Sequence, residues 1–391
     1  MVEGHSAAEP LAPLRVLHVS PYFFPAHVYG GPIQSTYRLC VASAQLGCDI
    51  RVLTTNANGT QRVLALPTTR AVTLEGGVQV RYCARVGQHS ASPSLLAGLG
   101  PAVRWAEVVH LQAVYSFPTL PTLLACRLLG RPLVWSPRGA LQRWTGTTRA
   151  RAKAVWEQAS RLVAPARLRL HVTSEDEAEA SQRRLPNVRT QVIPNGMDVP
   201  AQVEHVPGDG VLRLLFLGRL HPIKALENLL DACQLLDQRG VVWQLTVAGT
   251  GEPAYQERLC ERARQAGLAG RVRWAGQVSD AAKPGLFAET DVLVLPSHTE
   301  NFGMVVAEAL GHAVPVIASR GTPWARLEEI GCGLWTDNSA AALAAAVDRL
   351  RRMPRREMGA RGRAWIAREF GWDSVARSML ALYHEVRADA A

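Results

Sequence analysis

Two carboxylates flank the start of a predicted helix in the second half of the chain. Glu300 and Glu308 have seven residues between them and follow an apolar run at 292–295 that predicts a buried strand. A helix N-terminus offers free backbone N–H groups and a partial positive charge, both of which suit a phosphate. Ionised carboxylates accept hydrogen bonds from hydroxyl groups, including those of a sugar. The segment therefore predicts a site for a sugar joined to a phosphate.

The loop between these carboxylates decides whether they can share a ligand. If all the intervening residues were helical, the carboxylates would lie about 12 Å apart on different faces. The loop at 299–303 must therefore fold back, and Gly303 permits a close backbone approach. Asn301 and Phe302 offer backbone N–H groups beside it. Two solvated surface glutamates are the alternative interpretation.

Two cations follow the first strand of the second half. The strand predicted at 212–217 ends in Gly218, and Arg219 and Lys224 lie five residues apart across the next loop. Such a pair can bind a diphosphate and neutralise the charge of a leaving group. An ordinary loop with solvent-facing cations is the alternative, but the chain has only three lysines, so Lys224 favours a functional role.

Three features of the first half could line the same cleft. Gly30 and Gly31 lie between a strand and a helix start, where they allow a ligand close to the backbone. They do not form Gly-x-Gly-x-x-Gly, and no Walker sequence occurs, so simple dinucleotide and P-loop sites are disfavoured. His110 and Arg138 each follow a first-half strand. His110 also fits a structural histidine, and Arg138 an anion contact.

Strands and helices alternate along the whole chain, which predicts an α/β protein with parallel sheets. A Pro- and Gly-punctuated stretch at 199–210 predicts a linker between a first domain at 14–200 and a second at 210–371. An amphipathic helix at 372–388 ends the chain. Ligands of such sheets bind beyond the carboxyl ends of the strands. The strands are expected at 14–20, 50–54, 78–82, 108–112, 133–136, 170–173, 212–217, 244–248, 272–275, 292–295 and 314–318.

Composition narrows the class of protein. The seven scattered cysteines contain no Cys-x-x-Cys, which indicates a reducing cytosol rather than a disulfide framework or zinc site. No Asp-x-Asp or Gly-x-Ser-x-Gly occurs, so no metal and no serine nucleophile is expected. No signal peptide or membrane span is apparent, and residues 1–13 predict a loose tail.

The net charge of +10 lies entirely in the first half, where residues 1–200 hold 21 Lys and Arg against 11 Asp and Glu. This excess suggests an anionic partner, either lipid headgroups, a diphosphate carrier or nucleic acid. A solvated Arg-rich surface is the alternative. Aromatic-interleaved basic platforms are missing from the sequence, which disfavours nucleic acid.

Taken together, these segments resemble the family 4 glycosyltransferases, retaining enzymes of the GT-B fold. The resemblance covers residues 16–383. It implies two Rossmann-like doubly wound domains that face each other across a cleft, with the C-terminal helix crossing back to the first. Its motifs match at 193–198, 216–224, 295–310 and 320–324.

The resemblance also implies roles for the residues above. Arg219 and Lys224 would hold the donor diphosphate, Glu308 the nucleotide ribose, and Glu300 the hydroxyls of the transferred sugar. The implied reaction moves a hexose, without metal or cofactor, from a UDP- or GDP-sugar to a lipid-linked glycan in cell-surface polysaccharide synthesis. The protein would be cytoplasmic, with a peripheral contact on the inner face of the cytoplasmic membrane. The backbone of the loop would contact sugar and phosphate through Asn301, Phe302, Gly303 and Met304. The glycine pair Gly30 and Gly31 would close over the diphosphate and the acceptor.

Three positions depart from the family pattern. Ala225 replaces the usual Gly after the clamp lysine and is expected only to stiffen the helix start. Gln112 replaces the second histidine of a His-x-His, and Arg138 replaces the histidine of Pro-His-Gly, so the acceptor side is less well defined. A nucleotide-sugar epimerase or a phosphorylase-like enzyme on the same scaffold is the alternative. A phosphorylase would need a pyridoxal phosphate lysine, and Lys283 has no supporting motif.

Overall fold

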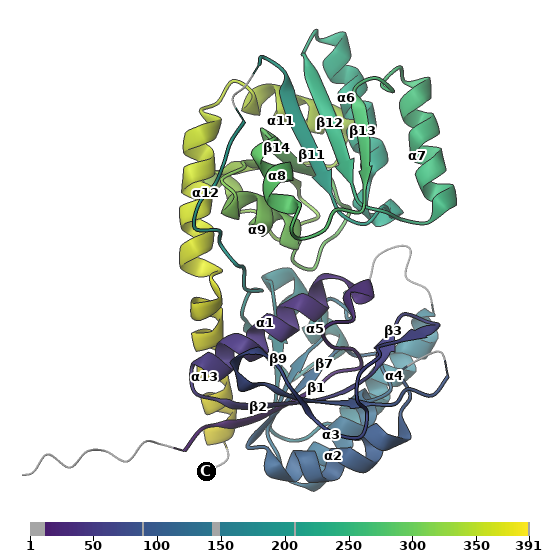
Figure 1. Ribbon diagram of the computed structural model, residues 1–391, viewed down its shortest axis with the longest axis vertical. Coiled ribbons are helices and arrows are strands. Elements are labelled where there is room, and N and C mark those ends of the chain that lie inside the picture. Colours follow the sequence, from purple (N-terminus) through teal and green to yellow (C-terminus); the bar gives the residue numbers. More distant parts are fainter. Residues whose placement is uncertain (1–11, 88–89, 143–148, 207–208, 390–391) are drawn as a thin grey trace, which may run out of the picture.

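The chain forms two α/β domains, each built on a mainly parallel sheet, and Figure 1 shows one above the other. The computed structural model describes residues 12–87, 90–142, 149–206 and 209–389. The predicted tail at 1–13 lies almost entirely outside this range. The first sheet has the strand order β10-β9-β8-β7-β1-β2-β6-β5, and the second has the order β13-β12-β11-β14-β15-β16.

The central strands of the first sheet are largely apolar and buried on both faces, as expected for parallel strands covered by helices, whereas Gln79–Cys83 and Arg189–Val192 toward its edges have exposed residues. Only the short edge strand β5 (Val72–Thr73) pairs antiparallel. The others are β1 (Arg15–Val19), β2 (Asp49–Thr55), β6 (Gln79–Cys83), β7 (Val108–Gln112), β8 (Leu133–Ser136), β9 (Leu168–Val172) and β10 (Arg189–Val192). A separate hairpin is formed by β3 (Ala57–Asn58) and β4 (Arg62–Val63).

Five helices connect these strands. Their bounds are α1 (Gly31–Gln45), α2 (Pro93–Trp105), α3 (Thr119–Leu128), α4 (Ala150–Val163) and α5 (Glu175–Arg184). Ser174 caps α5 by accepting a hydrogen bond from the Glu177 backbone N–H, as its position before an acidic turn predicts. Two short 3-10 helices, η1 (His27–Tyr29) and η2 (Glu75–Gly77), complete the domain.

The second sheet is parallel throughout. Its strands are β11 (Leu212–Leu217), β12 (Trp243–Ala248), β13 (Val272–Gly276), β14 (Val292–Leu295), β15 (Val316–Ser319) and β16 (Gly333–Thr336). Its helices are η3 (Pro222–Lys224), α6 (Leu226–Gln238), α7 (Pro253–Gln265), α8 (Lys283–Ala288), α9 (Met304–Gly311), α10 (Leu327–Ile330) and α11 (Ala340–Leu350).

The chain passes twice between the domains at one place. The Met197 backbone N–H donates to the Phe370 carbonyl at 2.7 Å, so the outgoing and returning segments lie side by side. Helix α12 (Arg355–Glu369) runs along the second domain, and α13 (Trp372–Ala388) packs on α1 of the first (Figure 1). The predicted fold, including the helix that crosses back, is confirmed.

Candidate active site

The loop between β14 and α9, residues 296–303 (the donor loop), folds back as the sequence requires. The Glu300 backbone N–H donates to the Gly321 carbonyl at 2.9 Å, and Trp324 Nε1 donates to the Phe302 carbonyl at 2.5 Å. Gly303 has φ +76° at the N-cap of α9, a left-handed conformation that glycine adopts without strain. Phe302 is buried against Trp324, so its side chain anchors the loop and does not face a ligand.

Glu300 and Lys224 meet in this site. The Lys224 Nζ forms an ion pair with Glu300 Oε1, and Ser297 Oγ donates to the same oxygen at 2.7 Å. The His298 backbone N–H donates to the Ile223 carbonyl at 2.8 Å, which holds the lysine loop against the donor loop. The spacing of the two motifs predicted both residues, and the fold brings them into contact.

Glu308 has a cation partner of its own. Lys283 Nζ lies 2.8 Å from Glu308 Oε1 and 3.0 Å from Asp280 Oδ1. Burial lowers the pKa of Lys283, but the two carboxylates raise it by more, so the ammonium is held in its charged form. Lys283 entered the sequence interpretation only as an unsupported cofactor lysine, because nothing in the sequence places it beside Glu308.

Arg219 differs from the two lysines of this domain. Its side chain is exposed just after β11, and among the described residues it forms no ion pair. The carboxylates Glu300 and Glu308 are each matched by a lysine. Arg219 therefore contributes positive charge that no ion pair among the described residues neutralises.

The first domain faces the donor loop closely. Gly30 is the N-cap of α1, and a Cβ on Gly31 would lie 3.7 Å from the Met304 side chain. Ser174 Oγ donates to the Asn301 carbonyl at 3.2 Å. The glycine turn and the donor loop thus face each other where the two domains meet.

His110 lies in the interior of the first domain. Its Nδ1 is 2.7 Å from the Tyr383 hydroxyl on α13, and its Nε2 is 2.6 Å from Ser136 Oγ, which also contacts His171 Nδ1 at 2.7 Å. The His18 ring lies against the His110 ring. Because His110 is fully buried with both nitrogens engaged, its catalytic assignment stays a prediction that this geometry does not favour.

Arg138 joins two segments of the first domain. Its Nε donates to Gln112 Oε1 at 3.0 Å and its Nη1 to Asn195 Oδ1 at 2.7 Å. Arg138 Nη2 and Gln112 Nε2 are buried without a partner in the described part of the chain. Its predicted anion contact would require this arrangement to open, and remains a prediction.

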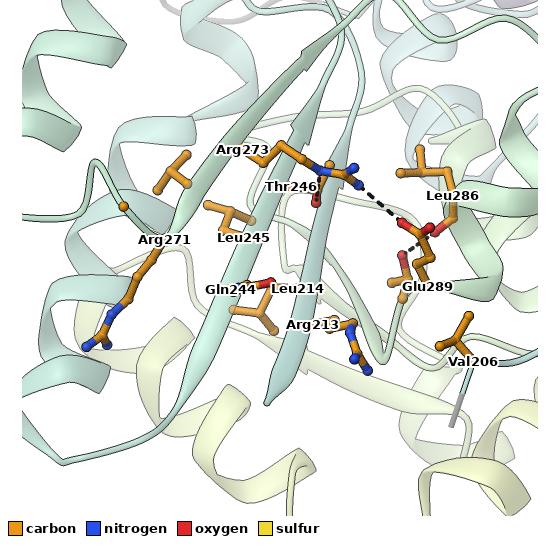
Figure 2. A pocket seen from close by; sticks show the side chains of 13 residues that line it. Val206, Arg213, Leu214, Gln244, Leu245, Thr246, Arg271, Arg273, Leu286 and Glu289 are labelled. Carbon is orange, nitrogen blue, oxygen red and sulfur yellow. Dashed lines mark hydrogen bonds and ion pairs between the residues drawn. The ribbon is translucent and has the colours of Figure 1, made fainter. Parts of the chain in front are cut away.

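A hollow of about 430 Å³ on the second sheet is lined by none of the residues of the donor loop. Figure 2 shows its arginines, which lie near the amino ends of β11 and β13. Arg273 is 3.4 Å from Glu289, and Arg213 is 2.8 Å from Asp209. Ligands of parallel sheets bind at the carboxyl ends, and these cations are already paired, so the hollow does not carry the chemistry.

Comparisons with known proteins decide the family. The family model described as "Glycosyl transferases group 1" matches residues 202–365, and the "Glycosyl transferase 4-like domain" matches residues 30–196. The chain is a family 4 glycosyltransferase. Its enzyme class and GT-B fold are therefore those expected from the sequence.

Curated relatives of this glycosyltransferase have several specificities. A D-inositol 3-phosphate glycosyltransferase of Thermomonospora curvata is 33% identical over 50% of the chain and 47% of its own length. The chain thus spans about half the length of this relative. A GDP-mannose:cellobiosyl-diphosphopolyprenol alpha-mannosyltransferase of Xanthomonas campestris is 28% identical over 77% of the chain and 80% of its own length.

Solved structures share the fold of this glycosyltransferase. Sucrose-phosphate synthase from Thermosynechococcus elongatus superposes with a TM-score of 0.73 at 20% identity, covering 96% of the chain and 100% of that structure. HepE of Anabaena in complex with UDP gives a TM-score of 0.71 at 15% identity, covering 95% and 100%.

Proposed function

We propose that this glycosyltransferase moves a hexose, with retention of anomeric configuration and without a metal, from a UDP- or GDP-sugar to a lipid-linked glycan. The observation that carries the proposal is the pair of lysine–carboxylate contacts beside the donor loop. Lys224 meets Glu300 and Lys283 meets Glu308, both at the carboxyl edge of the second sheet. The product would belong to a cell-surface polysaccharide.

The charges of the site suit a departing diphosphate. Donor binding would draw Lys224 from Glu300 toward the phosphates, where Arg219 adds a second positive charge. Fixed cations of this kind stabilise negative charge that develops on a leaving group. Glu300 would then accept hydrogen bonds from sugar hydroxyls. An acceptor hydroxyl that enters from the first domain would attack the anomeric carbon on the face from which the diphosphate leaves and pass its proton to the departing diphosphate oxygen, which gives retention.

A panel of UDP-, GDP- and ADP-sugars tests the reaction. The protein is incubated with each donor and with a polyprenyl-diphosphate-linked glycan, and the product anomer is read by nuclear magnetic resonance. The proposal predicts transfer with retention from a UDP- or GDP-sugar and unchanged activity with a chelator. Conversion of the donor sugar without any acceptor would indicate an epimerase instead, and an inverted product would contradict the retaining mechanism.

A surface on the first domain supports contact with an anionic membrane. Helices α2, α3 and α4 pack side by side, and Figure 1 places α2 and α3 at the end farthest from the second domain. Their one acidic residue, Glu157, is buried. Half of the ten exposed large apolar side chains of the described chain lie on these helices: Leu96, Leu124, Leu128, Val155 and Leu162. The same helices carry the basic residues Arg104, Arg127, Arg151, Lys153 and Arg161.

Exposed apolar side chains among cations are typical of a surface that rests on anionic lipid, where each basic residue contributes about 1 kcal/mol. Within the described ranges no helix combines the length and hydropathy needed to cross a membrane. We therefore propose a cytoplasmic protein that binds the inner face of the cytoplasmic membrane through this surface.

Vesicle sedimentation tests this contact. Leu128→Asp with Leu162→Asp should abolish binding to phosphatidylglycerol vesicles, and the wild type should not bind pure phosphatidylcholine. Val242→Asp is the matched control, because Val242 is exposed on the second domain. Equal binding by the control and the double variant would contradict the assignment of the surface.

A further inference from the structure

A buried carboxylate of the first domain contacts the donor loop of the second. Glu177, on the first turn of α5, has no exposed surface. Its Oε1 accepts from the Gly139 backbone N–H at 2.5 Å, and its Oε2 accepts from the Thr173 backbone N–H at 2.8 Å. With the Asn301 amide nitrogen turned toward it, that nitrogen donates to Oε1 at 3.2 Å and to Oε2 at 2.8 Å.

The first domain is shaped to receive Asn301. Ser174 Oγ donates to the Asn301 carbonyl at 3.2 Å, so the residue is held by its backbone as well as its amide. A Cβ on Gly139 would lie 2.9 Å from the Asn301 Cβ, closer than real side chains approach. Gly139 thus makes room for Asn301.

The position of Asn301 gives the contact a consequence. Asn301 directly follows Glu300, which is paired with Lys224 of the second domain. The donor loop is therefore fixed on one side by its own domain and on the other by Glu177. Leaving a buried carboxylate without its hydrogen-bond donors is costly, so Glu177 favours the position of Asn301 seen here.

We propose that Glu177 is a positioning residue for this reaction: through Asn301 it holds the donor loop against the first domain and so fixes Glu300 relative to the acceptor. Glu177 lies in the first domain, touches no substrate, and acts when the two domains are together. This inference rests on the proposed role of Glu300, whereas the contact itself does not.

Charge exchange across the contact tests the proposal. Asn301→Asp places a carboxylate against Glu177, and the two should repel. Adding Glu177→Gln to it should restore a donor–acceptor pair. Small-angle X-ray scattering of the unliganded variants should show a larger radius of gyration for Asn301→Asp, and the wild-type value for the double variant.

Turnover of UDP-glucose and GDP-mannose is measured in parallel. Asn301→Asp should lower kcat about 10- to 100-fold, because small displacements of a reacting group have effects of that size, with a smaller change in KM. The loss should shrink as the pH falls, since two facing carboxylates can share a proton. The double variant should recover about tenfold in kcat, a coupling typical of residues in contact.

The outcomes separate this inference from the reaction itself. Glu177→Gln alone can disturb the first domain through Gly139 and Thr173, so Asn301→Asp, on a loop, carries the test. Unchanged scattering by Asn301→Asp, or a double variant no more active than the single one, would overturn the proposal. If neither donor is turned over, the proposed donor class fails, while scattering still decides whether Glu177 holds the loop.

Discussion

The Lys224 ammonium and the Glu300 carboxylate, 76 residues apart in the sequence, form an ion pair between two loops of the donor domain. Both side chains are largely buried, with 19% and 11% of their surface exposed. In a low-dielectric site opposite charges attract strongly, so we expect the contact to persist until a donor replaces it. In the proposed reaction the pair would link charge stabilisation to recognition of the sugar.

Removing either member should reduce turnover strongly. Lys224→Ala and Glu300→Gln are each expected to lower kcat about 10²- to 10³-fold, the usual loss for a group that stabilises transition-state charge. Because the residues contact each other, the double variant should lose little more than the worse single variant. Arg258→Ala, exposed on α7, is the control. Fully additive losses would show that the two groups act independently.

Lys283 should act on donor binding rather than on chemistry. In the proposed site its contact would orient Glu308 for the nucleotide ribose, so Lys283→Met should raise KM for the donor about tenfold with little change in kcat, which indicates lost uniform binding. The control is Arg349→Met, on the exposed surface of α11. A fall in kcat at constant KM would place Lys283 in the chemical step.

The backbone conformation of Ala225 should destabilise the fold relative to a glycine at this position. Its φ of +49° lies in the left-handed region, so the expectation that it merely stiffens the helix start is wrong. Ala225→Gly should raise the free energy of unfolding by about 1 kcal/mol, because a Cβ in this conformation costs about that amount. Ala381→Gly, exposed in the helix α13, should lower it by about 1 kcal/mol. Equal effects of the two variants on denaturant unfolding would contradict the assignment.

The buried histidines should make the fold sensitive to acid. Burial, then the charge of Arg138, lowers the pKa of His18 and of His171 to about 3. Between that value and the unfolded value near 6.5, the unfolded state binds more protons, so stability is complete above pH 6.5 and falls as the pH drops toward 3. Each histidine contributes a slope of about 1.4 kcal/mol per pH unit.

Substitution of one histidine tests this slope. His18→Phe removes one titrating group, so the unfolding free energy measured between pH 5 and 6.5 should change less with pH than in the wild type. His384→Phe, exposed on α13, is the matched control. A wild-type slope in His18→Phe would show that His18 does not contribute to the acid sensitivity.

The long apolar strands could be predicted from the sequence, because burial on both faces leaves a continuous apolar run. The strands 108–112, 133–136, 212–217 and 292–295 have the bounds expected. The two-residue strands β3, β4 and β5 were missed, since two residues produce no detectable pattern. The four-residue strand β16 was missed because Gly333 and Thr336 leave only two apolar residues between them.

Only part of the candidate site could be predicted from the sequence. The motifs indicated Lys224 and Glu300, but Glu177 sits in an acidic first turn that also suits a helix dipole, and no pattern shows that it is buried. The same limit applies to His110, because a histidine within a strand can line a cleft or fill a core. Tyr383, which contacts it, lies 273 residues away.

Binding of nucleotide diphosphates tests the central claim most directly. Thermal unfolding of the wild type and of Lys224→Ala is followed with UDP, GDP and ADP over a range of concentrations. At 100 times Kd one of UDP or GDP should stabilise the wild type by about 2.7 kcal/mol, and the variant should require a much higher concentration for the same shift. If no nucleotide raises the stability of the wild type, or if the variant responds as the wild type does, the assignment of the donor site is contradicted.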